Sequence, residues 1–344
     1  MSLSTLLMAS TKEVVEEIIT SSSELVPWSS ALAYWWVIQM SSTKIVAWHS
    51  NWIVAATVDW SWNLSWWTWV AYWSWYHRQL VVKVWTDACA IFGIQWSNEW
   101  FRVYTLSWTT LNLVQTGTAQ SATDRRNYST EYISEWLFIL TFWDYRDNWD
   151  RQQCYRIWTY DSITETITLW WVIQHATSSV ITACRVSDTQ AAITHLYNWV
   201  ASIRLWTITW TSIAFTSTTV YDTTSWEVDM TEIDTNKFLI CWNNWGTKGR
   251  IATFNWTDFD LWPIYTLTWW PTTKIRVWKI SQYSAILIWT QSKSVIHIDW
   301  TWLTISDTVV LNAYEHAESW NITSWMWYAW YNSWTTTQIS IYKN

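Results

Sequence analysis

Glycine is almost absent from this chain, with 4 residues in 344. Average usage is roughly 7%, so most turns lack the residue that adopts a positive φ without strain. Basic residues are also few, and a net charge of −7 argues against the basic stripe that a nucleic-acid groove needs. No apolar run reaches the roughly 18 residues that a membrane-spanning helix requires, so we expect neither a nucleic-acid partner nor a membrane span.

Tryptophan is present in a matching excess, at 41 residues, eight of them between positions 51 and 75. Many follow Asp or Asn or stand in pairs between strand-like runs, which are places where hairpins turn. Asn-Gly, Asp-Gly and Gly-Gly are the usual signals there, because tight hairpin turns need φ > 0. Examples are Asp59-Trp60, Asn198-Trp199, Asn255-Trp256, Asp299-Trp300, Trp66-Trp67, Trp170-Trp171 and Trp269-Trp270.

One cause would explain both anomalies. We hypothesise genetic recoding, in which a codon that the organism decodes as glycine, most simply UGA, is read here as tryptophan. The alternative is a truly tryptophan-rich protein with stacked aromatic ladders. Trp48 and Trp242 lie inside apolar strands and fit genuine tryptophans under either hypothesis.

The first 22 residues differ from the rest. Lys12, Glu13, Glu16 and Glu17 alternate with Val and Ile at helical spacing, which predicts a short helix around 11–20. Acidic residues occupy the place where the cleavage site of a signal peptide would lie, so we do not expect this segment to be a signal peptide. We therefore expect a helical docking segment at 1–22, followed by the main domain at 23–344.

From residue 30 onward, short runs rich in Val, Ile, Thr, Tyr and Phe indicate an all-β chain. A turn followed by a strand recurs at roughly the 40–50-residue period of β-propeller blades. The copies are "DWSWNLS" (59–65), "SWTTLNL" (107–113), "TYDSITE" (159–165), "TWTSIAF" (209–215), "NWTDFDL" (255–261) and "DWTWLTI" (299–305).

The number of units predicts a seven-bladed β-propeller, with six blades as the alternative. Six units run from about 37 to 312, and the remaining tail supplies three strands. The segment 23–36 resembles the last strand of the unit that ends with 259–270, including Pro27 against Pro263. We expect this N-terminal strand to complete the last blade and cover its open edge.

The repeat resembles a family of tandem-repeat propellers found among phage virion and tail proteins, with Trp where that family has Gly. The segments "SSTKIVAW" (41–48), "SDTQAAITHLY" (187–197), "WVASIRLWTITWTSIAF" (199–215) and "IDTNKFLICW" (233–242) carry the resemblance. It implies a propeller on a virion surface, in a fibre, tail or decoration. The pattern consists of turns and core strands, so it implies no catalytic residues.

The cysteines and histidines suggest structural roles. Cys89, Cys154, Cys184 and Cys241 form no CxxC and lie in or beside apolar runs, which predicts buried free thiols, with one disulfide between blades as the alternative. We expect His195 and His297 at similar strand positions of different blades, where they would converge on a metal or ligand near the axis; satisfied structural histidines are the other interpretation.

Two polar stretches are candidate sites. Asp144, Asp147 and Asp150 offer oxygen ligands for Ca²⁺, although their spacing is not that of an EF-hand and a solvated hairpin tip explains them as well. Arg125 and Arg126 lie in a predicted loop and offer bidentate contacts to a carboxylated sugar, or simply a soluble face.

The functional expectation is a non-enzymatic virion protein without a cofactor. No nucleophile elbow, P-loop or H-E-x-x-H motif is present. Its partners would be other virion proteins or a host surface glycan, and it is a possible homo-oligomer. The alternatives are a cell-surface propeller adhesin or lectin and, third, a glycan-cleaving enzyme.

Overall fold

The computed structural model describes most of the chain between Glu16 and Lys343. The described residues are 16–21, 35–41, 43–49, 52–58, 64–66, 70–71, 77–95, 98–108, 110–120, 124–134, 137–147, 150–174, 181–197, 199–209, 212–215, 218–223, 225, 227–269, 275–289, 292–299, 302–305, 309–310, 318–323, 326–332 and 337–343. They contain only β-strands as regular elements, which confirms the all-β prediction.

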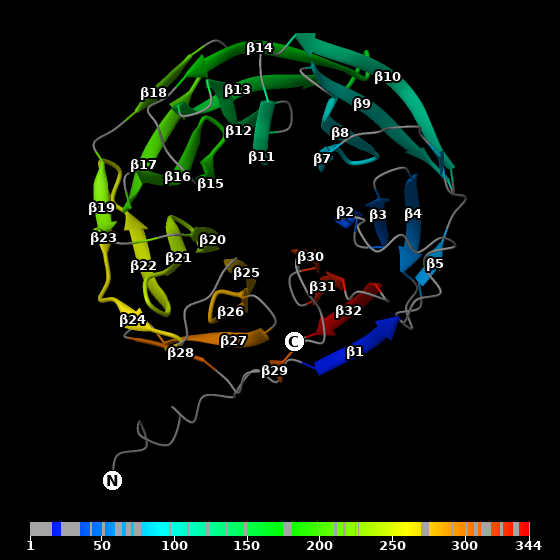
Figure 1. The fold of residues 1–344 in the computed structure, drawn as a ribbon. Helices are drawn as coiled ribbons and strands as arrows, with labels where there is room; N and C mark the ends of the chain where they lie inside the picture. The colour runs from blue at the N-terminus through cyan, green and yellow to red at the C-terminus, as the bar shows by residue number, and fades with distance from the viewer. Residues whose placement is uncertain are drawn as a thin grey trace.

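The described strands form seven antiparallel sheets of four or five strands, arranged in a ring (Figure 1). In the first half of the chain, the sheets are built from consecutive strands. One sheet holds β2 (Trp35–Ser41), β3 (Lys44–His49), β4 (Trp52–Val58), β5 (Leu64–Trp66) and β6 (Val70–Ala71). The next holds β7 (His77–Trp85), β8 (Ala88–Gln95), β9 (Asn98–Ser107) and β10 (Thr110–Gln120). A third holds β11 (Asp124–Ser134), β12 (Leu137–Asp147), β13 (Asp150–Asp161) and β14 (Thr166–Gln174).

The second half repeats this arrangement. The fourth sheet holds β15 (Ile181–Ser187), β16 (Gln190–Tyr197), β17 (Val200–Ile208), β18 (Ile213–Phe215) and β19 (Thr219–Asp222). The fifth holds β20 (Val228–Asp234), β21 (Lys237–Asn243), β22 (Thr247–Phe254), β23 (Phe259–Leu261) and β24 (Tyr265–Thr266). The sixth holds β25 (Ile275–Ser281), β26 (Ser284–Trp289), β27 (Ser292–Asp299), β28 (Trp302–Ile305) and β29 (Val309–Val310).

The remaining sheet joins the two ends of the chain. It contains β30 (Glu318–Thr323), β31 (Met326–Asn332), β32 (Thr337–Lys343) and, beside β32, the N-terminal β1 (Glu16–Ser21). β1 runs antiparallel to β32, with Ile19 opposite Ile341. A strand from the N-terminal region therefore covers the edge that β32 would otherwise expose.

Two N-terminal predictions are corrected here. The helix predicted at 11–20 is wrong for 16–20, which lie in β1, while 11–15 lie outside the described residues. The edge strand is β1 and not the predicted segment 23–36, of which only Trp35 and Trp36 are described, as the start of β2. Ile18, Ile19 and Thr20 are β-branched and favour a strand, and pairing with β32 outweighs the helical spacing of the sequence.

We call β2, β7, β11, β15, β20, β25 and β30 the inner strands, because each is the first strand of its sheet's consecutive series and lies nearest to the ring axis (Figure 1). Each inner strand contacts the inner strands of the sheets on either side, and β2 contacts both β7 and β30. The contacts therefore pass once around the whole ring. This is a β-propeller-like architecture.

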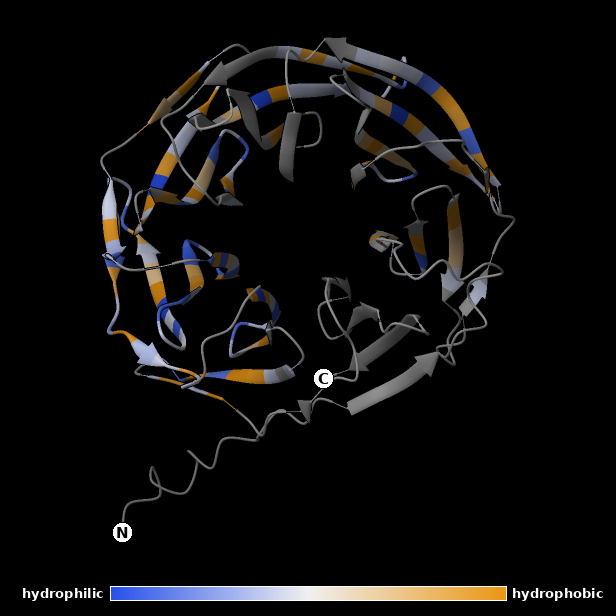
Figure 2. Cartoon of the chain, viewed as in Figure 1, coloured by the Kyte–Doolittle hydropathy of each residue, from blue (hydrophilic) through white to orange (hydrophobic). Residues whose placement is uncertain are grey.

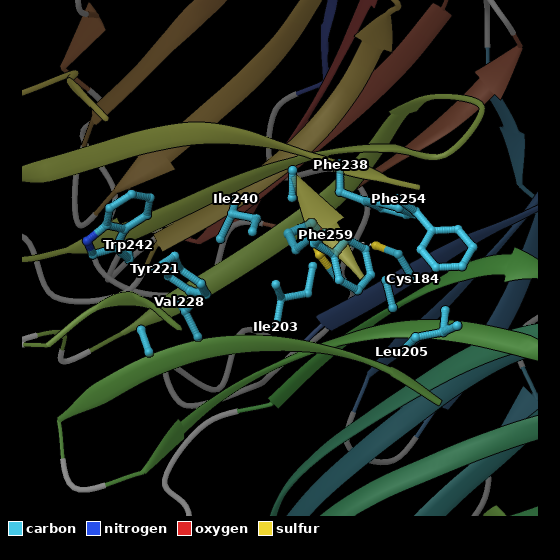
Figure 3. Close-up of a cluster of buried hydrophobic side chains, with 14 of the residues drawn as sticks. Cys184, Ile203, Leu205, Tyr221, Val228, Phe238, Ile240, Trp242, Phe254 and Phe259 are labelled. Atoms are coloured by element: carbon cyan, nitrogen blue, oxygen red, sulfur yellow. Dashed lines mark hydrogen bonds between the residues drawn. The ribbon is translucent and has the colours of Figure 1, made fainter. Parts of the chain in front are cut away.

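The hydrophobic core is divided into clusters, each lying between two neighbouring sheets. In the cluster of Figure 3, Cys184, Ile203 and Leu205 come from one sheet, and they pack against side chains of the next. Those partners are Phe238, Ile240, Trp242, Phe254 and Phe259. The sheet of β15 to β18 contributes to two such clusters, so both of its faces are buried, and apolar residues are frequent along many described strands (Figure 2).

The repeated turn-and-strand motif occupies one place in the fold. Six copies span the connection from the third to the fourth strand of their sheets, as in β22–β23 and β17–β18. In the β22–β23 turn, Oδ1 of Asn255 accepts the backbone N–H groups of Thr257 and Asp258, at 3.2 and 2.9 Å. The repeat is thus a hairpin signal with a hydrogen-bonded turn at its centre.

Candidate functional site: the bulge ring and the Asp229 clamp

The inner strands share an irregularity at the same point. In every inner strand, the pairing register with the second strand shifts two residues before the last residue of the inner strand, which is a β-bulge or a related irregularity. Such bulges re-aim side chains and terminate pairing. The residue within each shift is aliphatic or Met: Met40, Val84, Ile133, Val186, Ile233, Ile280 and Ile322.

The residue just before each shift carries a polar group. We call this set the bulge ring, and it has one member per sheet: Gln39, Lys83, Tyr132, Arg185, Glu232, Lys279 and Asn321. Three members are cations and one is a carboxylate. The bulge ring therefore bears excess positive charge in a protein whose net charge is −7.

The hairpins that follow the bulges are held by short side chains. Oγ of Ser281 accepts the backbone N–H of Tyr283 at 3.0 Å, and Oδ1 of Asp234 accepts that of Thr235 at 2.9 Å. Ser41 has the same role toward Thr43, at 3.3 Å. This is the physical basis of the repeated Ser or Asp at the end of an inner strand, because these side chains stabilise turns locally.

Three members of the bulge ring, Arg185, Glu232 and Lys279, lie close enough for their charges to interact, and Lys83 reaches the backbone of the adjacent inner strand. Nζ of Lys83 donates a hydrogen bond to the carbonyl of Met40 on the adjacent inner strand, at 2.6 Å. Burial lowers the pKa of Lys83, and the nearby Asp87 opposes the shift. Burial raises the pKa of Glu232, and the positive charges of Lys279 and Arg185 oppose that shift.

A second polar group links three inner strands. Asp229 of β20 accepts a hydrogen bond from Oγ1 of Thr182 on β15 at 3.1 Å and another from the backbone N–H of Val277 on β25 at 2.8 Å. We call these three residues the Asp229 clamp. Burial raises the pKa of Asp229, while Arg276 and the hydrogen bonds favour the charged form.

The two groups differ in what they can do chemically. Asp229 is buried and both of its oxygens already accept hydrogen bonds within the protein, so it joins sheets. The bulge ring is more open: the side chain of Arg185 is 43% exposed although it is paired with Asp188. Its Lys and Arg side chains can bind carboxylate or phosphate groups.

The arginine candidates lie in a strand, which corrects their predicted placement in a loop. Arg125 and Arg126 belong to the inner strand β11. Their backbone partners on β12 are Asp144 and Trp143. The two candidate sites thus share one sheet, and Arg125 lies opposite Asp144.

The predicted calcium ligands lie at the β12–β13 hairpin. Asp147 and Asp150 are backbone partners that close it, and Asn148 and Trp149 between them lie outside the described residues. Within the described ranges, no group of three or more His, Cys, Asp or Glu side chains is arranged to hold a metal ion. Calcium binding stays a prediction.

The prediction of buried free thiols is confirmed. The prediction that His195 and His297 lie at similar strand positions is wrong. All four cysteines are free and buried, and burial raises the pKa of Cys89 to about 12. His195 lies in the second strand of its sheet and His297 in the third strand of another, so they are not equivalent. Nε2 of His195 contacts Oγ of Ser202 at 2.9 Å, a structural pairing.

The sequence carries a signal for the bulge ring, although the bulge ring was not among the predicted sites. A residue with a polar group directly precedes an aliphatic residue or Met at the end of each first strand, as in Arg185-Val186 and Lys279-Ile280. The Asp229 clamp has no comparable signal, because its three members come from three separate repeats.

No helix in the described residues has the length and hydropathy to cross a bilayer.

Comparison with known proteins gives a fold and no family. No family model and no curated protein matches the chain. Among solved structures, a Bacteroides uniformis protein described as a "putative 6-phosphogluconolactonase" has a TM-score of 0.59 at 8% identity, covering 80% of this chain and 84% of its own. A Lactobacillus plantarum protein has a TM-score of 0.57 at 9% identity, with the same coverages. A Bacteroides fragilis protein with the same description as the first has a TM-score of 0.54 at 7% identity, covering 80% and 83%. Likeness at this identity supports the β-propeller-like fold alone.

Proposed function

We propose that the protein is a seven-bladed β-propeller whose last blade is completed by β1. Three observations support this: the seven described sheets, the contacts that pass around all inner strands, and the pairing of β1 with β32. In this proposal each sheet is one blade, and the ring is a rigid scaffold that presents its connecting loops.

We further propose that the scaffold serves a virion as a non-enzymatic structural or tail-associated module that binds an anionic glycan of a host surface. The bulge ring carries this proposal, because the same position of every inner strand holds a residue with a polar group, and three of these residues are cations. Carboxylated or phosphorylated sugars present the anionic groups that Arg and Lys bind. The virion setting rests on the resemblance of the repeat.

The experiment compares binding of the purified protein to polygalacturonate, an acidic polysaccharide, and to dextran, a neutral one. The variants are Arg185→Glu and Lys279→Glu in the bulge ring, with Lys248→Glu on β22 as the matched charge control. We expect binding to polygalacturonate alone, roughly tenfold weaker in each bulge-ring variant and unchanged in the control, since one charged contact contributes about 1–2 kcal/mol. Equal weakening in all three variants, or no binding, would refute the site.

The alternatives have their own readouts. Release of reducing ends from the polysaccharide would favour a glycan-cleaving enzyme. Hydrolysis of 6-phosphogluconolactone would favour the activity in the descriptions of two similar structures. Immunogold labelling of bacterial cells and not of phage particles would favour the cell-surface adhesin.

A further inference from the structure

Tryptophan occupies most of the unusual backbone positions. Six described non-glycine residues have a positive φ, and four of them are Trp: Trp108 at 54°, Trp199 at 68°, Trp245 at 54° and Trp256 at 76°. The other two are Glu165 and Asn236, and Asn is enriched in this region. A left-handed conformation lowers the folded-to-unfolded ratio roughly 5- to 30-fold for a residue with a Cβ. A tryptophan at each of these four positions therefore destabilises the folded state.

Each of these tryptophans lies in a turn where glycine is the expected residue. Trp199 follows Asn198 in a two-residue connection between the paired Tyr197 and Val200. Asn-Gly is the leading sequence for such a hairpin, since both of its turn residues need φ > 0. Trp256 follows Asn255, whose side chain holds the β22–β23 turn.

The remaining two show the same pattern. Trp108 lies in the two-residue connection between Ser107 and Thr110, which are paired. Trp245 directly precedes Gly246, in the β21–β22 connection, where Gly246 has a φ of 150°.

Burial does not compensate for the strain, although the Trp256 ring lies 6.0 Å from the Phe254 ring. Trp108 is 89% exposed, Trp256 is 78% exposed and Trp245 is 73% exposed. Trp199, at 60%, is also exposed. An exposed indole forfeits most of the burial free energy that makes Trp valuable in a core.

Other tryptophans are buried and are not among the residues with a positive φ. Trp242 is fully buried and its indole Nε1–H donates to the carboxylate of Asp222. Trp100 is buried and lies directly across from Gly93. A Cβ on Gly93 would lie 2.4 Å from the Trp100 ring, so the glycine and the tryptophan fit each other as they stand.

We infer that residues 108, 199, 245 and 256 are glycine in the organism's own protein, and that residues 100 and 242 are tryptophan there. The gene would specify the first group by a codon that the organism decodes as glycine and the second by a standard tryptophan codon. This inference is independent of the proposed function. It also implies that the four exposed indoles are absent from the natural surface, so they cannot serve as sugar-stacking platforms.

Peptide sequencing by mass spectrometry of the protein from its natural source tests the inference. We expect glycine at the four turn positions, tryptophan at 100 and 242, and an intact mass below 41.2 kDa. Tryptophan at the four turn positions would overturn the inference. Glycine at 100 or 242 would overturn the assignment by backbone geometry and burial.

Variants of the chain as printed provide a second test. Trp199→Gly and Trp256→Gly should each raise the folded-to-unfolded ratio several-fold in urea titrations, because glycine removes the left-handed strain. Trp269→Gly is the matched control, since Trp269 is 83% exposed and is not among the positive-φ residues. The control should gain nothing, because glycine adds entropy to the unfolded chain. Equal gains at all three positions would contradict the reasoning.

Discussion

Replacing Asp229 by alanine tests whether the Asp229 clamp joins three sheets. The substitution leaves Oγ1 of Thr182 and the N–H of Val277 without the acceptors that now lie at 3.1 and 2.8 Å. An unsatisfied buried donor costs about 1–3 kcal/mol, so Asp229→Ala should lower the free energy of unfolding by about 2–6 kcal/mol. Thr182→Val removes one donor and should cost less, about 0.5–1.5 kcal/mol.

The assay is urea unfolding monitored by fluorescence. The wild type, the two single variants and the double variant form a double-mutant cycle. If the clamp is real, the double variant should cost less than the sum of the singles by about 0.5–3 kcal/mol, because the two side chains share one interaction. Additive losses, or a smaller loss for Asp229→Ala than for Thr182→Val, would refute the clamp.

The pH dependence gives an independent check with a definite sign. Burial raises the folded-state pKa of Asp229 above the ordinary 3.8, so the folded state binds this proton more tightly than the unfolded state does. The resulting stability is present below pH 3.8 and is lost as the pH rises through the folded-state pKa. Asp229→Asn does not titrate, so its stability relative to the wild type should increase as the pH rises above 3.8. A relative decrease over that window would contradict the raised pKa.

Three further predictions follow from the core and from the joint between the chain ends. The four buried cysteines should react with a thiol reagent only after unfolding, because the reagent cannot reach a buried sulfur; burial also raises the pKa of Cys89 and Cys241, so these two form little thiolate, and reaction in the native protein would show that a sheet contact opens. Trp242→Phe should lower the free energy of unfolding by about 1.5–3 kcal/mol, by removing the hydrogen bond to the Asp222 carboxylate, and no loss would show that this bond adds no net stability. Ile19→Pro and Thr20→Pro should differ in thermal unfolding, because only one of two adjacent N–H groups in an edge strand faces its partner; identical behaviour of the two variants and the wild type would argue against the β1–β32 ladder.

The local elements were predictable because their causes are local. A side chain that holds a turn, as Asn255 does in one copy of the repeat, acts within three residues, so the repeat revealed its hairpins without a structure. Alternating and continuous apolar runs likewise indicated an all-β chain. The period of the repeat then led to a ring of similar sheets.

Features that depend on distant partners were not predictable. Residues 16–20 have helical spacing, yet they form β1 because the edge of β32 is available to them. The Asp229 clamp depends on how β15, β20 and β25 align side by side. Neither alignment can be deduced from a single repeat, because the fold sets it only when neighbouring sheets pack.

The register of the β1–β32 ladder has a mechanical consequence. Glu16, at the start of β1, is the backbone partner of Lys343, at the end of β32. A pulling force applied at these two residues therefore acts on one end of the ladder and separates its pairs one after another. Strands loaded in this way yield at lower force than strands that must slide past each other with all pairs loaded together. Single-molecule stretching should accordingly open the ring at this joint first, as a small extension before any other sheet unfolds.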